Sequence, residues 1–154
     1  TSPASRRIHG FVDTCEEYHL PYELVLIDLG DTFEENRERI TRLVDQFEEK
    51  YPEKKKGIFM PNDTHANVLL NILFQRYGRL PDTYQIIGFD NSPISREAVI
   101  PLSTVGQQIP VIANEAMKLL SEQMEERKKR RPAPLKEPVH KVIPPILIQR
   151  DTTA

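Results

Sequence analysis

The sequence has few of the residues that mark disulfide-linked or membrane-spanning proteins. Among its 154 residues there is one cysteine, Cys15, which excludes an internal disulfide and agrees with a cytoplasmic protein. No apolar run approaches the roughly 20 residues of a membrane span. The net charge is −2, which argues against this segment gripping a nucleic-acid backbone, because that needs a concentrated positive field. We therefore expect one soluble domain that spans no membrane.

Signatures of catalysis and of cofactor binding are also missing. The six glycines are scattered and form no G-x-G-x-x-G or Walker pattern that would hold a nucleotide phosphate. The four histidines show no metal-ligand spacing, and no serine lies in a G-x-S-x-G turn. Cys15 falls within a predicted helix, where a buried inert thiol is favoured over a nucleophile. We expect no enzyme activity, no metal site and no cofactor.

Short apolar runs alternate with amphipathic segments along the chain. Strands are predicted at 23–28, 58–60, 83–90 and 102–105, and a last extended segment at 139–149 follows a stiff connector at 132–138. Helices are predicted from Ser2 to about Tyr18, after the capping box of Thr32 and Glu35, at 64–77 with Gly78 as C-cap, and from Ile109 onward. This alternation predicts an α/β fold with a doubly wound parallel sheet and helices on both faces.

Short polar side chains follow each of the first three predicted strands. Asp31 follows the first, Asn62 and Asp63 the second, and Asp90 the third. Ligands of open α/β sheets bind beyond the carboxyl ends of the strands, so these side chains are expected to converge on one edge. Carboxylates and amides suit hydroxyl-rich ligands such as sugars or nucleosides. The alternative for each residue is a helix cap or a turn, and Asn62 and Asp63 both stand where a cap is needed.

Several motifs resemble those of one regulator family, and they occur in its order across nearly the whole chain. They are RIHGF at 7–11, GD at 30–31, IFMPND at 58–63, GRLPD at 78–82, IIGFDN at 86–91, LSTV at 102–105 with Gln107, and ILIQR at 146–150. The sequence thus resembles the effector-binding core of the lac repressor and galactose repressor (LacI/GalR) family of bacterial transcription regulators.

This resemblance implies a type I periplasmic-binding-protein-like fold, in which two subdomains close on a sugar or purine. It also implies ligand contacts for particular residues. Arg7 matches an arginine that clamps polar groups of the ligand, Asn62 a cleft asparagine, Asp90 the aspartate that accepts ligand hydrogens, and Gln107 a glutamine near the subdomain crossover. Asp31, Phe33 and Asp63 are further candidates. The family's stacking aromatic follows its G-D turn directly, whereas here Thr32 takes that place and Phe33 comes next.

By the same resemblance, residues 1–154 correspond to a partial effector-binding domain, made of the carboxyl-terminal subdomain and the crossover segments. A DNA-binding domain is absent from this chain, and operator DNA would be bound through a missing N-terminal domain. The family also has a buried strand before the R-x-x-G-F helix, so an open sheet position is expected, which another copy of the chain could fill. Family members dimerise through this subdomain, which implies a homodimer.

Three functions compete on these grounds. The first is the ligand-sensing module of a transcription repressor, binding a small sugar-like effector that modulates DNA binding. The second is a sugar-binding protein of a transport system on the same fold. The third is a small doubly wound enzyme, for which clustered carboxylates are suitable but no nucleophile, metal set or cofactor loop is found. The first is favoured because the motifs match regulators.

Overall fold

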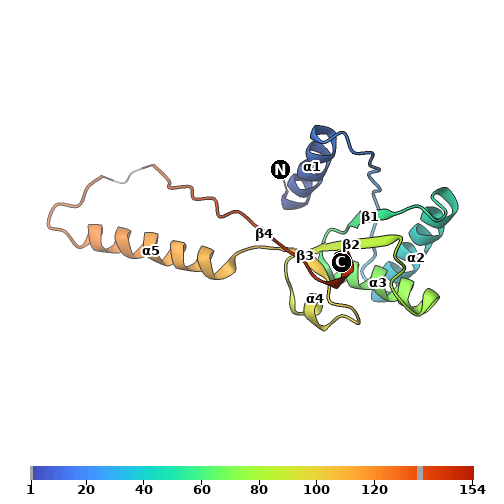
Figure 1. The fold of residues 1–154 in the computed structure, drawn as a ribbon. Coiled ribbons are helices and arrows are strands. Elements are labelled where there is room, and N and C mark those ends of the chain that lie inside the picture. Colours follow the sequence, from blue (N-terminus) through green and yellow to red (C-terminus); the bar gives the residue numbers. More distant parts are fainter. Residues whose placement is uncertain (1, 135–136) are drawn as a thin grey trace.

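The computed structural model describes residues 2–134 and 137–154, so two residues of the predicted connector, 135–136, lie outside the described residues. In chain order the elements are α1 (Pro3–Glu17), α2 (Phe33–Lys50), β1 (Lys56–Phe59), α3 (Asp63–Tyr77), β2 (Tyr84–Phe89), α4 (Pro93–Glu97), β3 (Ser103–Gly106), α5 (Ile109–Arg127), β4 (Ile146–Ile148) and the 3₁₀ helix η1 (Asp151–Thr153). Figure 1 shows a compact body from which α5 projects.

Local signals fix the ends of the first three helices. Ser2 Oγ accepts a hydrogen bond from the Ser5 amide, and Pro3 opens α1. Thr32 and Glu35 form the predicted capping box of α2. Gly78 ends α3 in the left-handed conformation, with φ at 70°, which glycine adopts without strain. The short helix α4 was not predicted, because Pro93 and a single turn leave too little periodicity to detect.

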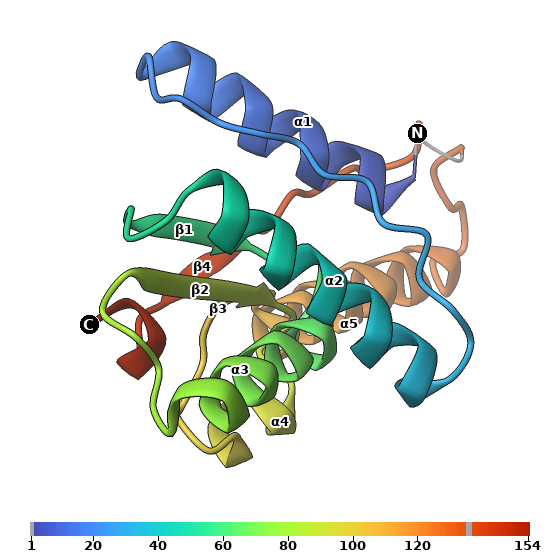
Figure 2. The same cartoon turned by 90° about the vertical axis from the view of Figure 1, so that its right-hand side faces the viewer.

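The sheet has the strand order β1-β2-β3-β4. The first three strands are parallel, with Ile58 opposite Ile86 and Ile87 opposite Ser103. The fourth strand runs antiparallel to β3 and places Ile146 opposite Gly106. The α/β prediction is therefore confirmed, and the last extended segment contributes an antiparallel edge strand. Figure 2 shows α1 and α3 on opposite sides of this sheet.

The hydrophobic core lies between the sheet and the helices α2 and α3. Six apolar residues of α3 are buried, as its wide apolar arc predicted, and so is Asp63. The largest fully buried apolar side chains are Ile40, Val44, Leu69, Leu70, Leu73, Ile86 and Leu102. On the other side of the sheet, α1 is placed by Phe11, whose ring stacks on Phe59 with centroids 6.0 Å apart.

The edge of β1 away from β2 has no partner strand within the described residues. The amides of Lys56 and Met60 donate to Thr83 and Ile87 across β2, at 2.7 and 2.8 Å. Because parallel pairing alternates along a strand, the peptide groups of Gly57 and Phe59 face the open edge. An apolar groove of about 620 Å³ lies beside this edge, between α1, α2 and the extended residues 21–27.

The prediction of a strand at 23–28 is wrong. Residues 19–30 form no helix or strand, and the side chain of Leu26 is 78% exposed. The segment is apolar and extended, but a strand also needs a neighbour that takes its backbone hydrogen bonds. Here the groove separates it from the open edge of β1. What fills that groove, including a second copy of the chain, stays a prediction.

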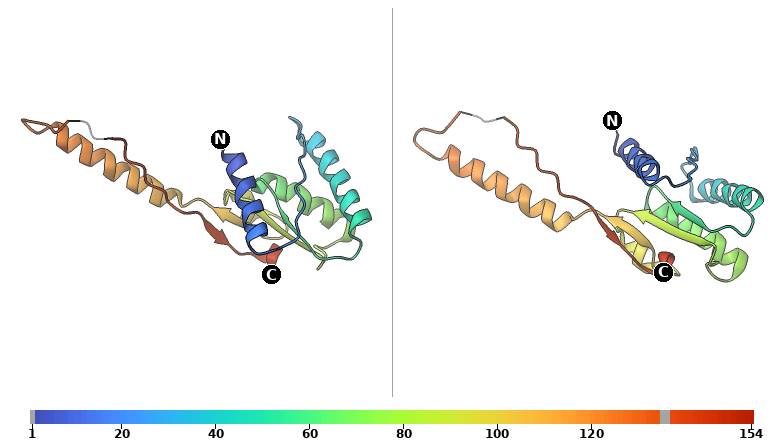
Figure 3. Two further views of the ribbon diagram at one scale, coloured as in Figure 1. Left: turned by 90° about the horizontal axis from the view of Figure 1, so that it is seen from above. Right: turned by 45° about the horizontal axis from the view of Figure 1, so that its top comes forward.

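Helix α5 and the returning segment leave the body together. Helix α5 has no buried residue, and Figure 3 shows it projecting with residues 137–145 alongside. The N-terminal end of α5 contacts the returning chain through Gln108, whose Nε2 donates a hydrogen bond to the Pro144 carbonyl at 2.8 Å. None of the helices within residues 2–134 and 137–154 combines the length and the hydropathy that a membrane span requires.

We predict that Leu69→Ala lowers the free energy of unfolding by about 2–5 kcal/mol, because Leu69 is fully buried and truncation leaves a cavity. Leu120→Ala is the matched control, since Leu120 is 49% exposed on α5 and should change stability by less than about 0.5 kcal/mol. Urea unfolding followed by circular dichroism measures both. Equal losses for the two variants would contradict this placement of the core.

Candidate functional site

Parallel pairing brings the ends of β1, β2 and β3 to one edge of the sheet. Asn62 follows β1 after two residues, Asp90 directly follows β2, and Gln107 directly follows β3. The carboxyl ends of parallel strands are where open α/β sheets bind ligands. Three of the predicted ligand contacts therefore stand at the same edge. The fourth, Arg7, reaches this edge from α1.

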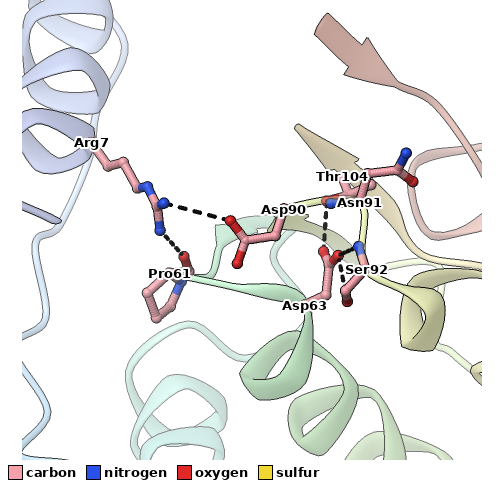
Figure 4. Close-up of polar contacts among 7 residues, drawn as sticks. All are labelled: Arg7, Pro61, Asp63, Asp90, Asn91, Ser92 and Thr104. Atoms are coloured by element: carbon pink, nitrogen blue, oxygen red, sulfur yellow. Dashed lines mark hydrogen bonds and ion pairs between the residues drawn. The ribbon is translucent and has the colours of Figure 1, made fainter. Parts of the chain in front are cut away.

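Arg7 and Asp90 face each other across the edge (Figure 4). Arg7 Nη2 lies 3.5 Å from Asp90 Oδ1, and Arg7 Nη1 donates to the Pro61 carbonyl at 3.0 Å. The guanidinium carbon stands 3.7 Å from the centroid of the Phe89 ring, a cation–π contact. Phe89 and Pro61 thus hold the guanidinium, while the Asp90 side chain keeps 46% of its surface exposed. A rigid guanidinium donor and a half-exposed carboxylate acceptor thus lie side by side.

Asn62 has a structural role as well as its place at the edge. Its Oδ1 accepts the His65 amide at 2.9 Å and caps α3, so the capping alternative holds for this oxygen. Burial lowers the pKa of the His65 imidazole, which therefore favours its neutral form. Among the four predicted ligand contacts, Arg7 is the cation. Gln107 is exposed, between the end of β3 and the start of α5.

Asp63 lies behind the edge and is 1% exposed. Its Oδ2 accepts the Ser92 amide at 2.8 Å and the Ser92 hydroxyl at 3.0 Å. Its Oδ1 accepts the Thr104 hydroxyl at 2.6 Å. Both carboxylate oxygens are thus occupied by the turn after β2 and by β3 (Figure 4). These contacts favour a role in holding that turn, and its direct contact with a ligand stays a prediction.

The turn after β2 has a costly backbone. Asp90 and Asn91 have φ angles of 105° and 50°, in the region that L-residues rarely adopt. Such conformations cost on the order of 1–3 kcal/mol each and persist only where neighbours enforce them. A second hold comes from Arg150, whose Nη2 donates to Asn91 Oδ1 at 2.9 Å and whose Nη1 donates to the Leu102 carbonyl at 2.9 Å. A strained turn fixed from two sides carries Asp90.

Asp31 and Phe33 are not joined to this cluster by any hydrogen bond or ion pair within residues 2–134 and 137–154. The Asp31 amide donates to Glu35 Oε2 at 3.0 Å and so belongs to the start of α2. Phe33 is the first residue of α2 and is 54% exposed. Their ligand contacts therefore stay predictions.

Sequence reasoning missed several residues of the site. The sequence pattern of Phe89 is that of a core strand residue. The contact of Pro61 is made by its backbone carbonyl, which the identity of the side chain does not predict. Thr104 and Arg150 stood in matched motifs, but their bonds to Asp63 and Asn91 span 41 and 59 residues. A signal was available in Gly88, because a Cβ there would stand 2.3 Å from Asp63 Oδ1. Only glycine lets this carboxylate lie against β2.

The described residues contain no group of three or more His, Cys, Asp or Glu side chains that could hold a metal ion. The polar groups at the edge are a guanidinium, a carboxylate and two amides, which can together donate to and accept from several hydroxyls at once.

A family model, the periplasmic binding protein-like domain, matches residues 1–153. The chain belongs to this family. It is 30% identical over 152 residues to the ribose operon repressor of Halalkalibacterium halodurans, covering 99% of this chain and 42% of the repressor. It is 28% identical over 155 residues to the HTH-type transcriptional regulator DegA of Bacillus subtilis, covering 100% of this chain and 42% of DegA.

A LacI family transcriptional regulator from Enterococcus faecium, solved with bound ribose, superposes with a TM-score of 0.70 at 25% identity. The match covers 98% of this chain and 52% of that one. The predicted resemblance to LacI-type regulators is thereby confirmed, and the curated relatives named above are transcriptional regulators. The chain spans 42% of the length of those relatives.

We predict that Gly88→Ala lowers the free energy of unfolding by about 1–3 kcal/mol, because the added methyl group collides with Asp63 and must displace it. Gly57→Ala is the control, since a Cβ there has no neighbour within 4 Å. Urea unfolding of both variants measures the difference. Equal midpoints would show that Asp63 does not lie against Gly88.

Proposed function

We propose that this chain is the effector-binding part of a bacterial transcription repressor. In this proposal it binds a small, hydroxyl-rich ligand of the sugar type at the edge formed by Arg7, Asn62, Asp90 and Gln107. Operator DNA is bound by a separate N-terminal domain of the whole protein, which acts in the cytoplasm as a homodimer. The curated relatives support this assignment, since one is an HTH-type transcriptional regulator and the other a ribose operon repressor.

The observation that carries the proposal is the pairing of Arg7 with an exposed Asp90. At 3.5 Å, with the Asp90 side chain half exposed, this ion pair contributes no more than about 0–1 kcal/mol. A ligand can therefore separate the two groups at small cost. The carboxylate then accepts two ligand hydroxyl hydrogens, while the guanidinium donates to ligand oxygens. Phe89 and Pro61 keep the guanidinium in place during this exchange.

Signal transfer requires a ligand that prefers one arrangement of the protein. A ligand shifts an equilibrium only by the difference between its affinities for the two states, and its coupling to DNA affinity is reciprocal. Gln107 lies two residues before the start of α5, and the Gln108 side chain donates a hydrogen bond to the Pro144 carbonyl of the returning chain. A ligand that contacts Gln107 would thus act beside the point where the chain leaves the body and comes back.

We expect a sugar from a panel of pentoses, hexoses and purine nucleosides to raise the melting temperature of the full-length protein. Binding to the folded state alone at a hundred times Kd adds about 2.7 kcal/mol of stability. Asp90→Ala should abolish the shift, because it removes the acceptor of the ligand hydroxyls. Differential scanning fluorimetry measures both.

Asp82→Ala is the matched control for this experiment. Asp82 is exposed and precedes β2, at the opposite end of the strand that Asp90 follows, so its loss should leave the shift intact. A shift that persists in Asp90→Ala would refute the assigned site. The lack of a shift with every compound would refute a sugar or nucleoside effector.

A further inference from the structure

We propose that Asp63 is a positioning residue for the ligand site, because its buried carboxylate holds residues 90–92 in the conformation that presents Asp90. This inference rests on the proposed function for the identity of the ligand. The hold on the turn itself rests on the contacts of Asp63 alone.

Asp63 controls two consecutive backbone amides of the turn. The Ser92 amide donates directly to Oδ2 at 2.8 Å. The Asn91 amide donates to Thr104 Oγ1 at 3.3 Å, and the Thr104 hydroxyl in turn donates to Asp63 Oδ1 at 2.6 Å. Thr104 is itself fully buried, so this relay is shielded from water. The Asp63 carboxylate thus holds the Ser92 amide directly and the Asn91 amide through the Thr104 hydroxyl.

The ordinary reading of Asp63 is a helix-capping acid in the first turn of α3. That role is already filled, since the Asn62 side chain caps the helix by accepting the His65 amide. Both Asp63 oxygens instead accept from Ser92 and Thr104, which lie outside α3. The negative charge still favours the helix N-terminus. Its hydrogen bonds, however, serve the turn.

The turn needs this hold because its backbone is unfavourable. Asp90 and Asn91 both have positive φ, and the last ladder bond of β2 is the Asp90 amide to the Val105 carbonyl at 2.9 Å. Beyond that bond, Arg150 holds the Asn91 side chain, whereas Asp63 holds the backbone. Without Asp63 the turn can relax toward common φ values, and the direction of the Asp90 side chain changes with it.

Asp63→Asn tests the hold with the smallest change in shape. The amide replaces one acceptor oxygen by a donor, which then meets the donors of Ser92 or Thr104. In the full-length protein without ligand, we expect the Asn91 and Ser92 amides to exchange with deuterium at least about tenfold faster, measured residue by residue by NMR. The Ile86 and Leu69 amides should keep their rates.

Asp45→Asn is the matched control, since it removes a carboxylate from an ion pair with Arg76 at 2.8 Å, in a different part of the fold. Thr104→Val isolates the relay and serves if Asp63→Asn does not fold. It should speed exchange at Asn91 and leave Ser92 protected, while Thr104→Ser should restore Asn91. Unchanged exchange at both amides in Asp63→Asn, or equal acceleration in Asp45→Asn, would overturn the proposal.

The link to ligand binding is tested by a double-mutant cycle with Asp90→Asn. Asp63→Asn should weaken binding of the sugar found in the thermal-shift panel by about tenfold to a hundredfold in the wild-type background. In the Asp90→Asn background it should have almost no further effect, because the group it positions is already lost. Equal losses in both backgrounds would show that Asp63 acts only on general stability and would overturn its positioning role.

The exchange experiment needs no ligand, so the two proposals fail separately. A wild-type protein that binds no compound of the panel would refute the proposed function. Fast exchange at Asn91 and Ser92 in Asp63→Asn would still establish the hold on the turn.

Discussion

The parallel pairing of β1, β2 and β3 is the constraint on which the site depends. It places the residues after each strand at one edge, where no single stretch of sequence could gather them. Asn62 and Asp90 lie 28 positions apart, yet the register that sets Ile58 opposite Ile86 and Phe59 opposite Ile87 brings the two strand ends together. Burial of Ile86, Leu69 and Leu73 in turn fixes that register.

The same edge separates two kinds of carboxylate. Asp90 is half exposed and paired loosely with Arg7, so it remains open to exchange partners. Asp63 is buried, and both its oxygens are occupied by hydroxyl and amide donors, so it is fixed. A loosely paired, half-exposed carboxylate therefore stands next to a buried one that is fully hydrogen-bonded. Separating Asp90 from Arg7 costs little free energy, whereas breaking the hydrogen bonds of Asp63 lets the strained turn relax.

The features predicted well from the sequence are those whose causes are local. The caps at Ser2, Thr32 and Gly78 each involve a partner three or four residues away, and the α/β alternation follows from short periodic segments. The prediction of a strand at 23–28 failed because an apolar run shows only a tendency to form extended structure, while a strand also requires a hydrogen-bonded neighbour. The prediction that Arg7 lies at the site came from the motif resemblance and not from any local sequence rule.

The hydrogen-bond partners of Asp63 could not be predicted from the sequence, because they are 29 and 41 residues away. The residue type and position fit a helix cap equally well, and only the three-dimensional contacts show that Asn62 already caps α3. Arg150 poses the same difficulty, since its guanidinium meets Asn91 across 59 residues. Long-range polar contacts of this kind need the fold before they can be assigned.

Helix α5 and the returning residues 137–145 lie, in the sequence, between the antiparallel strands β3 and β4. Gly106 and Ile146 are opposite each other in the register, so the chain leaves and re-enters the body at neighbouring positions. A short hairpin turn has the geometry to join two such positions. The pairing of β3 with β4 therefore sets no requirement on the length of the projecting segment, since its two ends meet at the same place in the sheet.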